Sequence, residues 1–303
     1  MIMKKIIFAF AFLFSVSFLF AQTAEKENLI QNEVAASRKT DNLPDGWKKS
    51  GKVTFLFNQS AFNNAWMAGG TSSMAGNFGL NYDFNYKKGN NVWDNKFIAA
   101  YGLTKLKGAE RNTKTDDRLE LNSLFGKKAS GDWYYSAFLN FKTQMDSGFD
   151  PTGATRISHF FSPAYLQVGP GMLWKKSDNL KVNFAPATSR LIIVDGQFTK
   201  LGTSFGVEQG KTIRYEFGAS VSGYYKLNLM ENVSMENILN LYSNYLDKPE
   251  NIDVDYQMNL VMKVNKFMSA NVSLQAIYDD NANPVKSEIQ IREVFGLGIN
   301  YTF

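Results

Sequence analysis

The chain has 303 residues, of which 20% are charged and 15% are aromatic, and its formal net charge at pH 7 is +5. That charge is too small to indicate a nucleic-acid-binding protein. The absence of cysteine excludes disulfides, thiolate metal sites and attachment of lipid through cysteine. A mean hydropathy of -0.27, with no long apolar run beyond the N-terminal segment, excludes membrane-spanning helices.

The first residues of the chain have the features of an export signal. Two lysines precede an apolar run over residues 6–20, and Ala21 provides a small residue for cleavage. We therefore expect residues 1–21 to be a signal peptide. Export without a membrane anchor leaves the periplasm, the outer membrane or the medium as destinations.

The next segment, residues 22–50, is polar and charged, and a Pro-Asp-Gly sequence lies near its end. We expect a flexible periplasmic segment here. From residue 52 onward the sequence alternates between apolar and polar or small residues. A β-strand sends such alternating side chains to opposite faces, so residues 51–303 are predicted to form one β-domain.

The alternation is clearest in residues 73–87 and 287–303. The apolar row of the first segment consists of Met74, Gly76, Phe78, Leu80, Tyr82, Phe84 and Tyr86. The apolar row of the second consists of Ile289, Ile291, Glu293, Phe295, Leu297, Ile299, Tyr301 and Phe303. Rows with so many aromatic residues are typical of strands that face lipid in outer-membrane barrels.

Twelve segments of the chain show this pattern. They are residues 52–59, 73–87, 92–105, 117–127, 132–144, 163–175, 179–187, 212–229, 232–246, 251–264, 267–279 and 287–303. The links after the even-numbered segments are short. The links after the odd-numbered ones are longer, except for residues 247–250.

Short periplasmic turns that alternate with longer outer loops are characteristic of outer-membrane barrels. We therefore predict an all-β fold, a transmembrane antiparallel up-and-down barrel of 12 strands, with 10 or 14 as alternatives. With the N-terminus expected in the periplasm, an even number of strands returns the C-terminus to the periplasm as well.

The last strand carries an expected signal for barrel assembly. Its apolar row runs to the final residue of the sequence, as in the terminal strands of bacterial outer-membrane barrels. The residues of this signal are Phe295, Leu297, Ile299, Tyr301 and Phe303. They are predicted to be recognised by the barrel-assembly machinery.

Several short segments resemble a known family when they are taken together. They are Asn58–Gly70, Thr143–Met145, Phe161–Leu166, Ile252–Tyr256, Lys263–Lys266 and Ile277–Asp280. This set resembles the Bacteroidota outer-membrane proteins grouped as domain of unknown function 3078 (DUF3078), over residues 45–303. The resemblance implies an exported barrel from a Bacteroidota-type envelope. It implies no activity and no functional residues.

Charged residues on the predicted inner rows gather near the outer ends of the strands. They are Arg118, Glu120, Arg214, Glu216, Asp253, Asp255, Asp279, Glu288 and Arg292. Charges of both signs in a lumen can select solutes. They can also pair into a network that stiffens the barrel, and the limited width of a small barrel favours this second interpretation.

The first outer loop contains an unusual run of asparagine, aromatic and glycine residues. Its notable members are Phe62, Asn63, Asn64, Trp66, Gly69 and Gly70. Asparagine and glycine favour tight turns, so the loop can fold inward as a plug. Exposed aromatic residues also mark contact sites, so the loop can equally be a docking surface. The sequence does not favour either.

Two weaker features suggest chemistry. His159, the single histidine, lies between Ser158 and Ser162, and a catalytic serine needs such an imidazole and a third group to orient it. The sequence around His159 does not match the strand-borne motif of outer-membrane phospholipase, a barrel enzyme, so His159 is interpreted as a loop residue. The polar run at residues 279–283 has no spacing of a calcium loop and is interpreted as a turn. We predict no catalytic residue, no metal and no cofactor.

The function predicted from these observations is a non-enzymatic barrel that serves as an accessory or structural subunit of an outer-membrane assembly. The alternative is a small-solute channel with a partly occluded lumen. The least favoured hypothesis is an outer-membrane lipid hydrolase built around His159. The predicted partners are outer-membrane lipid, the assembly machinery and other outer-membrane proteins, and nucleic acid is not among them.

Overall fold

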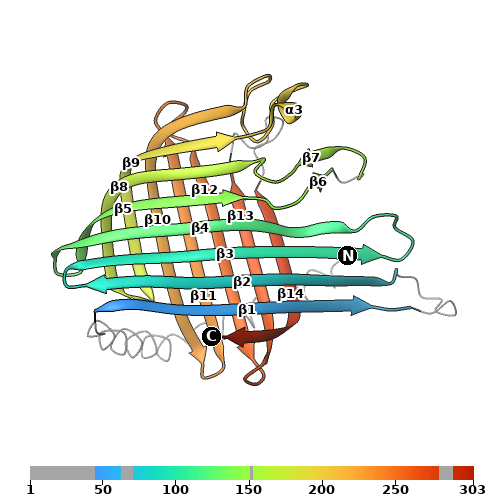
Figure 1. Cartoon of the computed structure of the whole chain (residues 1–303), viewed down its shortest axis with the longest axis horizontal. Helices are drawn as coiled ribbons and strands as arrows, with labels where there is room; N and C mark the ends of the chain where they lie inside the picture. Colours follow the sequence, from blue (N-terminus) through green and yellow to red (C-terminus); the bar gives the residue numbers. More distant parts are fainter. Residues whose placement is uncertain (1–44, 63–70, 151–152, 280–288) are drawn as a thin grey trace, which may run out of the picture.

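The computed structural model of the chain describes residues 45–62, 71–150, 153–279 and 289–303 (Figure 1). The predicted signal peptide lies outside the described residues, as does the predicted periplasmic segment up to residue 44. Twelve antiparallel strands close into a barrel. The predicted fold class and strand number are therefore confirmed.

The strands follow one another around the barrel in chain order, and β14 closes against β1. Their bounds are β1 Gly46–Ser60, β2 Ser73–Lys88, β3 Asn91–Leu106, β4 Thr113–Ser130, β5 Trp133–Thr143, β8 Ala164–Ser177, β9 Leu180–Ile193, β10 Ile213–Met230, β11 Val233–Asn244, β12 Ile252–Lys263, β13 Met268–Tyr278 and β14 Gln290–Thr302.

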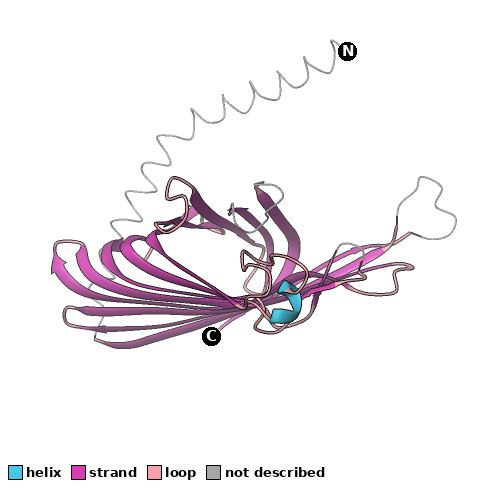
Figure 2. Ribbon diagram, turned by 90° about the horizontal axis from the view of Figure 1, so that it is seen from above, coloured by secondary structure: helices cyan, strands magenta, loops and turns pink. Residues whose placement is uncertain are grey.

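Three short elements lie outside the barrel wall, in two of the longer loops. They are the hairpin of β6 (Gly148–Phe149) with β7 (Arg156–Ser158), and the one-turn helix α3 (Gly196–Thr199). Figure 2 shows the helix beside the loops at one end of the strands. Within the described ranges, no helix has the length and apolar character needed to cross a membrane.

The two ends of the barrel differ in the length of their connections. Two-residue turns follow β2 and β4, and short links also follow β8, β10 and β12. In the first two turns Gly89 and Gly131 adopt a φ of 54°, a conformation that hairpin turns require and that glycine adopts without strain. We name this the short-turn end and the opposite one the long-loop end.

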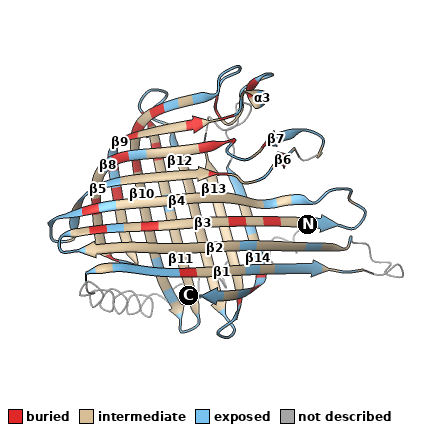
Figure 3. Cartoon of the chain, in the orientation of Figure 1, coloured by how far each residue is buried: buried red, intermediate tan, exposed pale blue. Residues whose placement is uncertain are grey.

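The outer face of the wall is apolar because the alternate rows place large side chains there. No other described residues cover them, so many remain exposed: Phe55, Phe57, Phe78, Trp93, Phe125, Trp133, Tyr135, Val168, Phe184, Tyr215 and Leu239. Figure 3 shows that few residues of the wall are fully buried. An apolar belt around a closed barrel is stable in lipid, and it would aggregate in water.

Three strand boundaries differ most from the prediction. β1 starts at Gly46, because its first residues pair with the end of β2, so the barrel begins before residue 51. β4 starts at Thr113 rather than 117. β9 continues to Ile193, where it pairs with Ala164 and Ile213, so the predicted loop at 188–211 is wrong in its first part.

The last residue closes the barrel seam. Gly51 and Phe303 exchange two backbone hydrogen bonds, of 2.7 Å and 2.9 Å. The Phe303 ring lies where a side chain on residue 51 would be, which explains the glycine there, and it stacks on Tyr82. The other four residues of the predicted assembly signal, from Phe295 to Tyr301, point outward and are more than half exposed, at 55% to 64%.

Gly218, on β10, should be the glycine of this strand least tolerant of a side chain. A Cβ atom there would overlap the backbone carbonyl oxygen of Ser243 on β11, whereas at Gly223 the nearest atom is 4.0 Å away. We expect Gly218→Ala to lower the free energy of unfolding by about 1–3 kcal/mol, because an overpacked backbone must shift. Urea unfolding in detergent measures this, and Gly223→Ala is the matched control. Equal losses in the two variants would contradict the interpretation.

Candidate functional site

The lumen contains a charge network, which is centred on Arg190 of β9. Its guanidinium lies 2.6 Å from a carboxylate oxygen of Asp253, 3.4 Å from Glu216 and 3.5 Å from Asp279. The side chains of Arg190 and Glu216 are only 11% and 3% exposed. The guanidinium also lies over the Tyr242 ring, 5.0 Å from its centroid. One cation thus holds carboxylates from three different parts of the wall.

A second cation completes this cluster near the long-loop end. Arg214 donates to Glu216 at 2.7 Å and lies 3.5 Å from Asp247 in the loop after β11. It also donates to the backbone oxygen of Gly206 at 3.2 Å, so it joins the wall to the loop between β9 and β10.

A second group lies on the other side of the lumen. Arg118 of β4 donates to Gln257 of β12 at 3.0 Å and lies 3.7 Å from Glu120. Asp255, next to Gln257 in the inner row of β12, accepts from Gln275 at 2.9 Å and lies 3.9 Å from the Lys142 ammonium. Polar side chains of four strands therefore meet at this level.

A third contact joins β14 to β4. Arg292 lies 2.6 Å from a carboxylate oxygen of Asp116, and it donates to the backbone oxygen of Thr115 at 3.3 Å. The two strands are not neighbours in the wall, since β1, β2 and β3 lie between them. This ion pair therefore spans part of the lumen.

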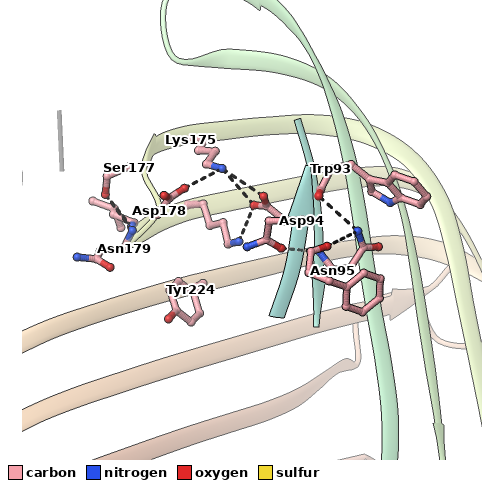
Figure 4. Close-up of polar contacts among 12 residues, drawn as sticks. Trp93, Asp94, Asn95, Lys175, Ser177, Asp178, Asn179 and Tyr224 are labelled. Atoms are coloured by element: carbon pink, nitrogen blue, oxygen red, sulfur yellow. Dashed lines mark hydrogen bonds and ion pairs between the residues drawn. The ribbon is translucent and has the colours of Figure 1, made fainter. Parts of the chain in front are cut away.

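The half of the lumen near the short-turn end is rich in lysine. Asp94 of β3 binds Lys175 of β8 at 3.2 Å, as Figure 4 shows, and Lys181 of β9 at 2.8 Å. Tyr224 lies beside them, with the Lys181 ammonium 5.4 Å from the centroid of its ring. Asp178, in the turn between β8 and β9, also pairs with Lys175, at 3.0 Å.

Lys96 of β3 makes a contact that crosses the whole lumen. It lies 3.4 Å from Glu236 of β11, which also accepts from the Tyr224 hydroxyl at 2.8 Å. In the order of strands around the barrel, β3 stands opposite β11, and β4 stands opposite β12. The Lys96–Glu236 and Arg118–Gln257 contacts therefore each run from one wall to the other.

The structure brings most of the predicted lumen charges together. Glu216, Asp253 and Asp279 share Arg190, while Arg214 joins them through Glu216. Arg118, Glu120 and Asp255 form the second group, and Arg292 pairs separately with Asp116. Glu288 lies outside the described residues. Arg190 is not among the residues predicted from the sequence, because Pro186 interrupts the alternation of β9. No nearby residue indicates that the side chain of Arg190 faces the lumen.

The predicted plug or docking loop is described only at its start. Phe62 is bound through its backbone amide to the Ser72 hydroxyl, at 2.9 Å. Asn63, Asn64, Trp66, Gly69 and Gly70 lie outside the described residues, so both interpretations remain predictions.

His159 contacts the loop between β9 and β10. Its Nδ1 donates to the Phe160 carbonyl at 2.7 Å, and its Nε2 lies 3.1 Å from Asp195 and 2.9 Å from the Gln197 amide. Ser158 donates instead to Gln144, and Ser162 accepts from the Asp195 amide. The histidine therefore holds two loops together, and its ring bonds to neither flanking serine hydroxyl, although its backbone exchanges two hydrogen bonds with that of Ser162.

The loop between β9 and β10 has a small core of its own. Val194 and Val207 are completely buried and pack with Ile192, Phe198 and Phe205. This core makes the loop a compact cap beside the mouth of the barrel.

In the described part of the chain, no group of three or more histidine and acidic side chains is arranged to hold a metal ion.

The docking of this cap should depend on pH through Asp195. The backbone amide of Gln197 and the His159 ring lower the pKa of this carboxyl in the folded protein. Because this pKa is lowered on folding, the ionised carboxylate stabilises the docked loop at pH values above the ordinary aspartate pKa of about 4. This stabilisation is lost as the pH falls through the pKa of Asp195 in the folded protein. We expect hydrogen-exchange protection of the Gln197 amide to decrease below about pH 4. Asp195→Asn should remove the pH dependence, and unchanged protection at acid pH would contradict the assignment.

Residues 57–149, from the end of β1 to β6, match the family described as protein of unknown function (DUF3078). The resemblance expected over residues 45–303 is thus confirmed for this part of the barrel, which includes Arg118, Glu120 and Lys96. A comparison with curated proteins finds no match.

The chain is also similar to solved barrels. The COG4313 outer membrane channel from Pseudomonas putida F1 has 12% identity, coverage of 86% of this chain and 96% of that chain, and a TM-score of 0.38. The translocator domain of autotransporter NalP from Neisseria meningitidis has 10% identity, coverage of 93% and 98%, and a TM-score of 0.32. The Pseudomonas putida toluene transporter TodX has 10% identity, coverage of 88% and 90%, and a TM-score of 0.33.

Proposed function

We propose that the protein is a non-enzymatic, integral outer-membrane β-barrel with a closed lumen, which serves as a structural or accessory subunit of a larger outer-membrane assembly. The contacts that cross the lumen, Lys96–Glu236 and Arg118–Gln257, carry this proposal. They stand at two levels and join opposite walls, so a hydrated solute meets side chains at both. A barrel of twelve strands is narrow enough for this.

The lengths of the connections at the two ends of the barrel support the proposed orientation, with both termini in the periplasm. Short turns face the periplasm in barrels of this kind, and longer loops face outward. The short-turn end, at which β1 begins and β14 ends, is then periplasmic. In this orientation the outward row from Phe295 to Phe303 is available to the assembly machinery, which supports its proposed role as an assembly signal.

Apolar side chains at the long-loop end support a role in an assembly. Leu201 is 97% exposed, Leu246 is 63% exposed and Phe160 is 60% exposed. They lie in three different loops, beyond the ends of the strands. Large exposed apolar side chains outside the lipid-facing wall are typical of contact sites between proteins.

Purification of the protein from gently solubilised membranes tests this role. We expect one partner protein to be recovered in a fixed ratio. Phe160→Asp combined with Leu201→Asp should reduce its recovery by at least about tenfold, because loss of two apolar anchors costs more than about 1.4 kcal/mol. Met230→Asp, at an equally exposed residue of the short-turn end, is the control. Recovery of the protein alone would contradict the proposal.

A small-solute channel is the second candidate. The inner rows are polar, and the contacts that cross the described part of the lumen are made by side chains, which rearrange more easily than a backbone plug. Recording in planar bilayers separates the two candidates. A closed barrel is expected to show no conductance, and steady conductance of the unmodified protein would favour the channel.

A further inference from the structure

The short-turn half of the lumen contains more ammonium groups than carboxylates. Glu236 lies on the inner row of β11 and is paired with Lys96. The charges of Lys52 and Lys226 also act on this region, and Lys263 acts on Lys52. Asp83 of β2 and Glu120 of β4 also act on Lys96, and Glu120 is already paired with Arg118. The four lysines therefore exceed the two carboxylates, Glu236 and Asp83, that remain to balance them.

The positions of these lysines follow from the strand register. Lys52 lies in the inner row of β1 with Thr54, whose hydroxyl donates to Asn300 of β14 at 2.9 Å. Lys226 follows Tyr224 in the inner row of β10 and stands opposite Glu236. Lys263 ends the row of β12 that contains Asp255 and Gln257. All three therefore face the lumen rather than lipid.

The three lysines are also accessible from the short-turn end. Lys226 and Lys263 are exposed, and Lys52 is half-buried. Within the described ranges none of their ammonium groups forms an ion pair, in contrast to those of Lys96, Lys175 and Lys181 in the same half. Unneutralised like charges in a confined space repel one another and attract counter-ions from solution.

We propose that Lys52, Lys226 and Lys263 form a binding site for small soluble oxyanions of the phosphate class, at the periplasmic mouth of the lumen. Lysine is a flexible point charge without a fixed donor geometry, so the site should select by charge rather than by shape. Pyrophosphate is therefore expected to bind more tightly than inorganic phosphate. Binding should weaken with added salt, because accessible charges are screened.

Titration of inorganic phosphate into the detergent-solubilised protein, followed by phosphorus NMR, tests this proposal. We expect saturable binding that weakens at least about tenfold in the Lys226→Gln/Lys263→Gln variant, since two of three charges are lost. Lys49→Gln is the matched control, because Lys49 lies on the same strand as Lys52 but on its outer face. The control should bind phosphate as the unmodified protein does.

The proposal is overturned if the unmodified protein shows no saturable phosphate binding, or if the double variant and the control bind equally. Retention of the folded barrel is checked by its resistance to unfolding in cold SDS, so that loss of folding is not mistaken for loss of the site. Partner recovery and bilayer conductance do not enter this readout. The oxyanion site and the closed structural barrel can therefore fail independently.

Discussion

Replacement of Arg190 by alanine is expected to destabilise the barrel by about 3–5 kcal/mol, which is the usual loss when one partner of a buried ion pair is removed. The reason lies in its surroundings. Arg190 holds Glu216, Asp253 and Asp279, and its removal leaves three carboxylates close together in a region where Glu216 is almost completely buried. Urea unfolding in detergent, followed by tryptophan fluorescence, gives the free energy.

Two variants separate the charge of Arg190 from its shape. Arg190→Lys should restore only part of the stability, because one ammonium cannot bind three carboxylates in the way that a planar guanidinium does. The combined change Arg190→Ala, Asp253→Asn and Asp279→Asn should regain more, since the repulsion is removed. This order of stabilities distinguishes an electrostatic role from a packing role.

An exposed ion pair provides the control for this experiment. Lys211 lies 2.6 Å from Glu208 in the loop between β9 and β10, and both side chains are more than 60% exposed, at 64% and 71%. Lys211→Ala should lower the free energy of unfolding by at most about 1 kcal/mol, as is usual when an ion pair on the surface is removed. If Arg190→Ala were no more harmful than Lys211→Ala, the cluster would not stabilise the fold.

The fold could be predicted because its main determinant is local. Alternation with a period of two residues fixes both the strands and their outer faces, and the contrast between short and long links fixes the topology. The inner row of β12, with Asp253 and Asp255, and the terminal aromatic row of β14 are examples. Both rows can be recognised from a few consecutive residues of the sequence.

The contacts of the lumen could not be predicted in the same way. Lys96 meets Glu236 only because closure and stagger of the barrel bring β3 opposite β11, and nothing near either residue encodes that pairing. Arg190 was missed for a different reason. Pro186 cannot donate a hydrogen bond to the neighbouring strand, and the bulge at this point shifts the register. The alternation of side chains therefore stops near Pro186, although the strand itself continues to Ile193.

Removal of the two contacts that cross the lumen, Lys96–Glu236 and Arg118–Gln257, should convert a non-conducting barrel into a conducting one. Lys96→Ser and Arg118→Ser together delete the long side chains that join opposite walls at two levels, and they leave the backbone of both strands unchanged. We expect stepwise conductance in planar bilayers for the double variant and none for the unmodified protein. Each single variant should remain closed or nearly so, since the other level still obstructs the lumen.

The control for this opening is an ion pair outside the lumen. Lys176, near the end of β8, lies 2.9 Å from Asp132 in the turn between β4 and β5, and Lys176→Ser with Asp132→Ser should leave the barrel without conductance. The current through the opened variant should also favour anions, because Lys52, Lys226 and Lys263 remain at one mouth and concentrate them there. Reversal potentials in a salt gradient measure this preference. A double variant that folds but does not conduct would show that the crossing contacts are not what closes the lumen.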